Sequence, residues 1–499
     1  MKFVILLFSF LIYLQASTLH LSISSNPSKL NPLISTDSAS STISQWIFNS
    51  LITYDKDANI KLELAKSYKF LDDTTLIFEL RDDVKWSDGE KFSAKDVIFT
   101  YESIISPKLF TPYANSFKFV KSVKALNPYM IEVKYKEPYF KALEIWMLDI
   151  IPEHILKDEK DLMTSKFNQN PIGTGEYILK KFQVSQDIEL VANDEHFLNR
   201  PKIDKLVYHF IPDASTQFLT LKSNKLDVGS LSPLQIDRQI DKNFKNSFNI
   251  FEDISNGYTY LGFNLKNPKF KNPKVRKALS LAIDRKELVD ILFFGHGQIC
   301  NGPFMPRTFA YNEAIKSPKQ DILKAKQLLK EAGYDDKNPF TFEIVTNSNN
   351  PTRMYAVEIL QHQFKKAGVI VKIRAMEWQA FLNTVVMPRN FEAVVLGWSL
   401  SLMPDARSIW HSKSSVKGGF NFVSYANDQV DALIEEAEKS VDRAKLSKIY
   451  KKIFQIIVED NPYLFLYIPN SITAVNKNIK NVTPSIIGVM HNVKDWIKP

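Results

Sequence analysis

The sequence is poor in residues that build several common kinds of functional site. Its 499 residues include one cysteine, Cys300, so neither an intrachain disulfide nor a thiolate metal cluster can form. Glycine is also scarce, with 15 residues, and no phosphate-binding loop, nucleophile elbow or HExxH motif occurs. The eight histidines form no local pair with metal-ligand spacing. The sequence therefore predicts no cofactor and no enzyme activity.

The charge is positive but not concentrated. The net charge is +9 and the isoelectric point about 9.1, yet only 11 of the 64 basic residues are arginine, and the lysines are spread along the chain. Nucleic-acid-binding proteins gather Arg and Lys on one face, so we expect no nucleic-acid partner. With 44% hydrophobic and 24% charged residues, the composition is that of a globular protein. At roughly 150 residues per domain, the length suggests about three domains.

The first 16 residues have the pattern of a secretory signal peptide. Lys2 precedes an apolar run of twelve residues, 3–14, which Gln15, Ala16 and Ser17 end with small and polar side chains. The run is too short to cross a bilayer core of roughly 30 Å, and no cysteine follows it for a lipid anchor. We expect cleavage after Ala16 and an exported, periplasmic protein.

Hydrophobic periodicity in the remaining chain alternates between strand and helix. Period-two patterns predict strands over residues 76–80, 131–135, 341–345, 369–373 and 391–396. Helical patterns cover residues 353–367, 427–437 and 446–457, a further helix is expected to begin after a cap at Ser93, and another to begin after a cap at Ser317 and to end at Gly333. This alternation favours α/β layers over a bundle or a sandwich.

One stretch carries a family resemblance. Residues 80–97 join a strand, the turn Trp86-Ser87-Asp88-Gly89 and a helix start, and they resemble the signature of the peptide- and nickel-type extracytoplasmic solute-binding proteins of ABC importers, solute-binding family 5. Further matches follow in the family's order along the mature chain, at residues 31–32, 51–55, 171–177, 261–264, 275–285, 328–334, 397–398, 404–405, 419–422 and 427–434. The chain is most similar to the dipeptide- and oligopeptide-binding members.

The resemblance implies a periplasmic-binding-protein-like α/β fold of two lobes joined by a two-strand hinge, with an extra α/β domain inserted in lobe I. Mapped onto this chain, lobe I takes residues 17–44, 172–258 and 480–499, the inserted domain takes 45–171, and lobe II takes 259–479. The strands expected to pass between the lobes are residues 258–264 and 471–476. Ligands favour clefts between such domains.

The resemblance also implies a function. A protein of this kind captures short peptides in the cleft between its lobes and delivers them to the permease subunits of an ABC importer in the inner membrane. The ATPase subunits act indirectly, and the receptor is expected to be a monomer. A peptide receptor needs a carboxylate for the ligand ammonium and donors for the ligand carboxylate.

Three lobe II residues lead the candidates for ligand contact. Asp405 stands where peptide-binding relatives carry an aspartate after the Gly-Trp strand, and we assign it to the ligand ammonium. Helix capping is its alternative role, because Asp is a favoured N-cap. Arg353 lies where relatives hold the ligand carboxylate, which a guanidinium binds bidentately, although it could equally be solvated. Trp398 is assigned to the cleft wall, with plain packing as its alternative.

Weaker candidates complete the predicted site. Asn421 and Gly419 are expected to offer amide or backbone contacts from lobe II, and Gly173, Thr174 and Tyr258 to contribute from lobe I. An alternative within the family is a receptor for nickel or a metal chelate, for which His411 and His491 are the candidate ligands. An exported hydrolase or chaperone is a further alternative that no motif supports.

Overall fold

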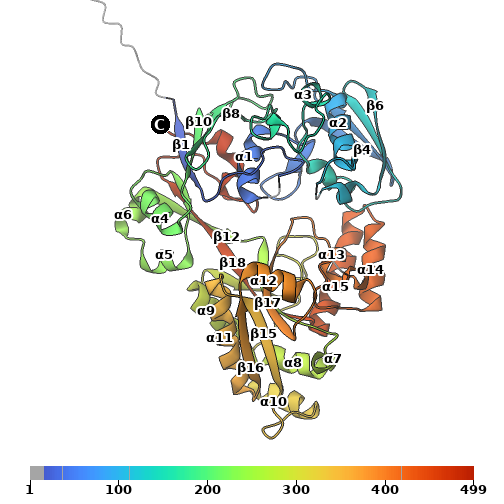
Figure 1. Cartoon of the computed structure of the whole chain (residues 1–499), viewed down its shortest axis with the longest axis vertical. Helices are drawn as coiled ribbons and strands as arrows, with labels where there is room; N and C mark the ends of the chain where they lie inside the picture. The colour runs from blue at the N-terminus through green and yellow to red at the C-terminus, as the bar shows by residue number, and fades with distance from the viewer. Residues whose placement is uncertain (1–15, 36, 112, 417–418) are drawn as a thin grey trace, which may run out of the picture.

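Strands and helices alternate along the chain and assemble into two α/β lobes, which lie one above the other in Figure 1. The computed structural model describes residues 16–35, 37–111, 113–416 and 419–499. The predicted signal peptide lies outside these residues, apart from Ala16. Among the described residues, no helix combines the length and apolar character needed to cross a membrane. The α/β class expected from the sequence is confirmed.

The upper lobe of Figure 1 holds two four-stranded sheets. One has the order β1 (Thr18–Ile23), β10 (Lys205–Phe210), β9 (Asp187–Ala192) and β8 (Tyr177–Phe182), with β1 parallel to β10. The other is antiparallel, in the order β4 (Ala65–Asp72), β5 (Thr75–Leu80), β7 (Met130–Tyr135) and β6 (Val120–Asn127). The small pair β2 (Ile52–Tyr54) and β3 (Ile60–Leu62) and the helices α1 (Ser38–Ile47), α2 (Ala94–Ile105) and α3 (Glu153–Leu156) complete this part.

The start of α2 follows the local chemistry of its sequence. The hydroxyl of Ser93 accepts from the Lys95 amide, and the Asp96 carboxylate accepts in return from the Ser93 amide at 2.9 Å, so both parts of a capping box are present. The preceding turn is closed by a hydrogen bond from the Gly89 amide to the Trp86 carbonyl. The predicted strand, turn and helix start are therefore confirmed in their predicted order.

The lower lobe is built on the greater part of an eight-stranded sheet. Its strands are β13 (Gly257–Phe263), β14 (Gly297–Ile299), β15 (Thr341–Asn347), β16 (Ile370–Met376), β17 (Ala393–Ser399) and the first half of β18 (Tyr463–Asn476). The helices of this lobe are α7 (Pro268–Lys271), α8 (Pro273–Leu281), α9 (Arg285–Phe293), α10 (Ile322–Glu331), α11 (Pro351–Lys366), α12 (Trp378–Phe381), α13 (Arg407–Trp410), α14 (Asp428–Glu438) and α15 (Arg443–Asp460).

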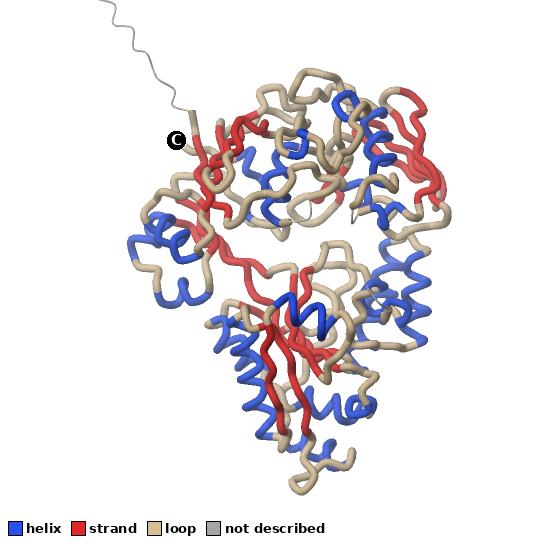
Figure 2. The backbone as a smooth tube through the Cα atoms, in the orientation of Figure 1, coloured by secondary structure: helices blue, strands red, loops and turns tan. Residues whose placement is uncertain are grey.

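One long strand belongs to both lobes. Residues 463–469 of β18 pair with β13 and β14, and residues 470–476 pair with β12 (Phe248–Ile254) and β11 (Val228–Ser230). At this upper end, α4 (Ala214–Lys222), α5 (Pro233–Arg238) and α6 (Lys242–Ser247) pack around the strands, as Figure 2 shows. The segment 258–264, expected to pass between the lobes, lies instead in the lower sheet as β13, and β12 with β18 makes the passage. The domain boundaries given above stay a proposal.

The helix expected after Ser317 begins later. It is α10, which starts at Ile322, and its N-cap is Asp321, whose carboxylate accepts from the Lys324 amide at 2.8 Å. Ser317 lies four residues before this cap, and its hydroxyl donates to the carbonyl of Cys300. The predicted end is confirmed, since Gly333 adopts a left-handed φ of 91° directly after the helix.

A buried histidine in the upper lobe gives a prediction about stability and pH. Burial lowers the pKa of His196 to about 4, and its Nε2 has no hydrogen-bond partner among the described residues. Between pH 6.5 and 4 the imidazole therefore binds a proton in the unfolded chain but not in the folded chain. The contribution of His196 to the free energy of unfolding is fully present above pH 6.5 and is lost as the pH falls towards 4. We expect wild type to lose about 2 to 3 kcal/mol of unfolding free energy relative to His196→Gln between pH 7.5 and 4.5. Urea unfolding of both proteins at several pH values measures this difference, and parallel curves would contradict it.

Candidate ligand-binding site

Three adjoining pockets lie between the hinge strands and the helices of the lower lobe. The hinge pocket, about 260 Å³, lies between β12 and the segment 484–489. The arginine pocket, about 520 Å³, shares Ser255 and Asn256 with it and is also lined by Arg353. The aromatic pocket, about 300 Å³, shares Trp398 and Ser399 with the arginine pocket. The shared residues place the three pockets next to one another in a row.

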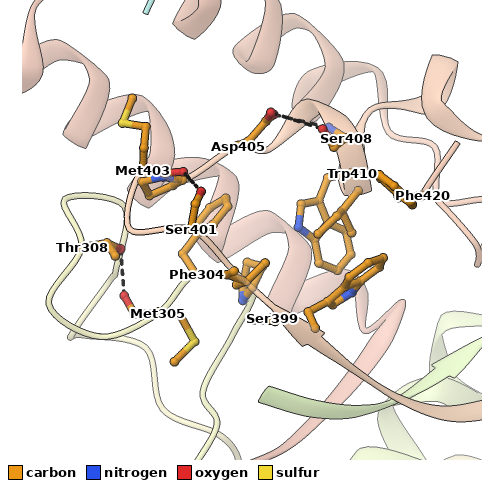
Figure 3. A pocket seen from close by; sticks show the side chains of 15 residues that line it. Phe304, Met305, Thr308, Ser399, Ser401, Met403, Asp405, Ser408, Trp410 and Phe420 are labelled. Atoms are coloured by element: carbon orange, nitrogen blue, oxygen red, sulfur yellow. Dashed lines mark hydrogen bonds between the residues drawn. The ribbon is translucent and has the colours of Figure 1, made fainter. Parts of the chain in front are cut away.

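The aromatic pocket has apolar walls and one carboxylate. Its walls come from the end of β17, from α13 and from the loops that carry Phe304, Met403 and Phe420, and Figure 3 shows side chains around the cavity. The aromatic residues that line it are Phe304, Trp398, Trp410 and Phe420. The indole of Trp398 stacks on Phe422 at 5.5 Å, which holds the ring in place at the end of β17. Flat apolar walls of this kind accept side chains or rings of a ligand without demanding one shape.

The arginine pocket contains a cation without a counter-ion. Arg353 lies in the first turn of α11, where the Asn350 side chain caps the helix by accepting from the Arg353 amide at 3.0 Å. Its Nη1 donates to Asn347 at 3.0 Å, and no carboxylate among the described residues forms an ion pair with it. Gly397 leaves the guanidinium its room, because a Cβ there would lie 2.8 Å from Nη2. Burial lowers the pKa of Arg353, and a half-buried cation of this kind favours an anionic ligand group.

Asp405 lines the aromatic pocket, but its carboxylate already has several partners. One oxygen, Oδ1, accepts from the amide of Arg407 at 3.0 Å, and Oδ2 accepts from the Ser408 hydroxyl at 3.2 Å. Oδ2 also pairs with the ammonium of Lys141, at 2.7 Å, across the contact between the lobes. Burial alone would raise the pKa of Asp405, yet Lys141 and the hydrogen bonds bring it below its ordinary value. Asp405 therefore lines the cavity and accepts from amides in the first turn of α13, whose N-cap residue is Ala406, while its contact with a ligand ammonium stays a prediction.

Tyr258 lies in the lower sheet and not in lobe I as expected. It is opposite Trp398 in the pairing of β13 with β17, and both residues line the arginine pocket. Its ring is buried against Tyr260 and Phe465, and its hydroxyl has no partner among the described residues. Tyr258 and Trp398 are thus neighbours in the wall of the arginine pocket, and Trp398 also lines the aromatic pocket.

Two other lower-lobe candidates support the pocket from behind. Asn421 is fully buried, and its side chain is used internally, donating to the carbonyls of His411 and Tyr425 and accepting from the Tyr425 amide. Gly419 is needed because a Cβ would lie 2.1 Å from the Ser414 carbonyl oxygen. Neither lines the three pockets, so the expected amide and backbone contacts are replaced by a role in holding the loop that carries Phe420.

The two upper-lobe candidates are packing residues. Gly173 lies against α1, where a Cβ would meet the Ile47 carbonyl oxygen at 1.8 Å, and its own carbonyl accepts from the Ser87 amide. Thr174 is buried and donates to Asn49 at 3.1 Å. Gly173 joins the segment 171–177 to the turn at Trp86, and neither residue lines the three pockets.

The two histidines proposed for nickel lie in different lobes. His411 is buried beside α14, where its Nε2 is 3.3 Å from Glu435, while His491 follows Gly488 in the C-terminal segment and donates to the Gly488 carbonyl. No group of three or more metal-ligating side chains among the described residues could hold a metal ion. The expected pairing of His411 with His491 therefore has no basis in this arrangement.

The residue that sequence reasoning missed is Lys141. It lies on the upper lobe between β7 and α3, 264 positions before Asp405. No local motif marks it, because its importance comes only from the contact between the lobes. In the sequence, Lys141 follows two aromatic residues, Tyr139 and Phe140, and its spacing does not distinguish it from the other lysines of the chain.

Two α/β lobes joined by a strand common to both, with a row of pockets beside the joint, define a two-lobed binding protein. The family model for bacterial extracellular solute-binding proteins, family 5 middle region, matches residues 59–420. The chain belongs to this family of extracellular solute-binding proteins, and it is a binding protein rather than an enzyme.

Similarity to individual proteins, in sequence and in structure, covers nearly the whole chain. The oligopeptide-binding protein AppA of Bacillus subtilis is 35% identical over 489 residues, covering 94% of this chain and 89% of the relative. The structure of that AppA in complex with a nonapeptide superimposes with a TM-score of 0.78 at 33% identity, covering 97% of this chain and all of the other. NikZ of Campylobacter jejuni, solved in complex with Ni(L-His), has a TM-score of 0.80 at 30% identity and covers 96% and 99% of the two chains.

Proposed function

We propose that this protein is the periplasmic substrate-binding component of an ABC importer, and that it captures short peptides between its lobes and delivers them to the membrane permease. The observation that carries the proposal is the pairing of an unneutralised guanidinium, Arg353, with an adjoining apolar pocket. A peptide offers a carboxylate for the first and varied side chains for the second. The likeness to a peptide-binding AppA supports this choice.

The proposed contacts follow from the row of pockets. Arg353 binds the ligand carboxylate, Trp398 and Tyr258 border the chain of the ligand, and the aromatic pocket accepts a side chain. Asp405 lies at the far end of the row, where it would meet the ligand's amino end. Export by the signal peptide and its cleavage after Ala16 belong to the same proposal, as do a monomeric state and ATPase subunits that act through the permease.

The ligand carried by the protein itself tests this function. We expect the protein, purified from its natural host compartment and denatured, to release short peptides of mixed sequence that mass spectrometry identifies. Mixed sequences are expected because apolar walls with few polar groups discriminate weakly among side chains. Release of a single non-peptide compound would contradict the proposal.

A nickel chelate is the second candidate, because NikZ with bound Ni(L-His) is similar to this chain over nearly its full length. A chelate of this kind brings its own imidazole, so the histidine-free lining of the aromatic and arginine pockets does not exclude it. Isothermal titration with nickel plus L-histidine, set against a panel of di- to nonapeptides, separates the two candidates. Binding of nickel plus L-histidine, with no peptide bound, would favour the chelate.

A further inference from the structure

A second contact between the lobes lies beside the aromatic pocket, opposite the hinge strands. The Phe140 amide of the upper lobe donates to the Glu438 carbonyl at the end of α14, at 3.1 Å. The next side chain, Lys141, reaches Asp405 at 2.7 Å, with 22% and 30% of the two side chains exposed. The backbone hydrogen bond therefore places Lys141 at the rim of the pocket that Asp405 lines.

Lys141 completes the set of partners of the Asp405 carboxylate. Oδ1 accepts from the amides of Arg407 and Ser408, and Oδ2 accepts from the Ser408 hydroxyl and from Lys141. A carboxylate offers about four acceptor positions, and all of them are used. A ligand ammonium can reach this carboxylate only by displacing the ammonium of Lys141, which is the same chemical group.

The remaining charge in the two larger pockets is positive. Among the described residues that line the aromatic and arginine pockets, the charged ones are Asp405 and Arg353. Asp405 is neutralised by Lys141, whereas Arg353 forms no ion pair within the described chain. These two pockets therefore attract an anionic group and offer no free carboxylate for a cation. The carboxylates that line the hinge pocket, Glu252 and Asp253, are paired with His296 and Arg307.

We propose that Lys141 determines ligand specificity by occupying Asp405, so that the receptor recognises the carboxylate end of a ligand and is indifferent to its amino end. This inference rests on the proposed peptide-binding function. A free ammonium gains little from Asp405, because it exchanges one ion pair for an equivalent one and breaks a contact between the lobes. Peptides with a blocked amino end are thus accepted as readily as free ones.

Lys141→Met tests the proposal, because methionine keeps an apolar stem without the charge. The probes are trialanine and N-acetyl-trialanine, which share the same free carboxylate, and isothermal titration measures their dissociation constants. For wild type we expect the two constants to agree within about threefold. For Lys141→Met we expect trialanine to bind at least about tenfold more tightly than its acetylated form, since an unpaired carboxylate is then open to it.

Arg238→Met is the matched control. Arg238 also contacts the other lobe, lying 5.6 Å from the ring of Phe294, but it is far from Asp405 in the fold. We expect it to leave the ratio of the two constants at the wild-type value, which separates loss of a lobe contact from loss of the counter-ion. Lys141→Ala repeats the test with a shorter side chain, and thermal unfolding verifies that each variant is folded.

The outcomes separate this inference from the function on which it rests. A wild-type protein that already prefers trialanine tenfold, or a Lys141→Met variant whose ratio stays near one, would overturn the role of Lys141 while leaving peptide binding intact. If neither probe binds to wild type or variant, the peptide-binding function falls, and the specificity inference falls with it.

Discussion

Arg353→Met is expected to weaken the binding of peptides with a free carboxyl end about a hundredfold. The guanidinium is half-buried and has no carboxylate partner within the described chain, so a ligand carboxylate supplies the charge that the pocket lacks. Removing one member of a buried, hydrogen-bonded charge pair costs about 2 to 5 kcal/mol. Methionine keeps an unbranched apolar stem and lacks the guanidinium that approaches Gly397, so the loss reports mainly on the charge.

The amidated form of the same peptide provides the internal comparison. Without its carboxylate, an amidated peptide should bind wild type weakly and change by less than about threefold in Arg353→Met, so the preference for the acid form disappears. Arg374→Met serves as the matched variant, because Arg374 lies on β16 of the same sheet and pairs with Glu343 at its surface. Titration calorimetry measures all the affinities. An equal loss for acid and amide would assign Arg353 to packing instead.

Gly173→Ala is expected to destabilise the upper lobe severely. The added Cβ would lie 1.8 Å from the carbonyl oxygen of Ile47, a backbone atom at the end of α1 that the neighbouring Gly175 amide also holds. Side-chain atoms can move aside from such a clash, but a backbone carbonyl within a helix end cannot do so without breaking hydrogen bonds. Overpacking typically costs about 1 to 3 kcal/mol, and a clash with a backbone atom lies at the upper end of this range or beyond it. We expect a fall in the melting temperature of several degrees or a failure to accumulate folded protein.

Gly89→Ala is the comparison that isolates the cause. Gly89 has a left-handed φ of 95°, but nothing lies within 4 Å of the position of its Cβ. Alanine there meets only the strain of the left-handed conformation, about 1 kcal/mol. Thermal and chemical unfolding should therefore order the proteins as wild type, Gly89→Ala and Gly173→Ala. If the two variants are equally stable, the close approach to Ile47 does not limit position 173.

Local patterns in the sequence were sufficient to predict most of the secondary structure. The capping box at Ser93 and the period-two strands at residues 76–80 and 131–135 depend on neighbours along the chain, and they appear where they were expected. The start of α10 was predicted four residues too early. Ser317 has the right identity for a cap, but its side chain lies at the carbonyl of Cys300, 17 residues away, and Asp321 caps the helix. The position that the fold gives to Ser317 is invisible in the local sequence.

The site was predictable only in part, for a related reason. The resemblance to the solute-binding family brought Asp405, Trp398, Arg353 and Tyr258 into the list, and all four line the pockets. The same signals cannot tell a pocket wall from the packing behind it, so Asn421 and Thr174 were included although both are buried away from it. Lys141 was missed because the contact with Asp405 joins different lobes.

The strand β18 has a consequence for how the chain matures. It lies near the C-terminus, yet its two halves complete pairings of β13 in the lower lobe and of β12 and β11 at the other end. During synthesis the N-terminal residues emerge first, so the eight-stranded sheet is complete only when residues 463–476 have been made, whereas the two four-stranded sheets of the upper lobe do not include this strand. A chain interrupted before this strand leaves unpaired edges in two places at once. A segment in the last tenth of the sequence thus completes the sheet that joins the two lobes.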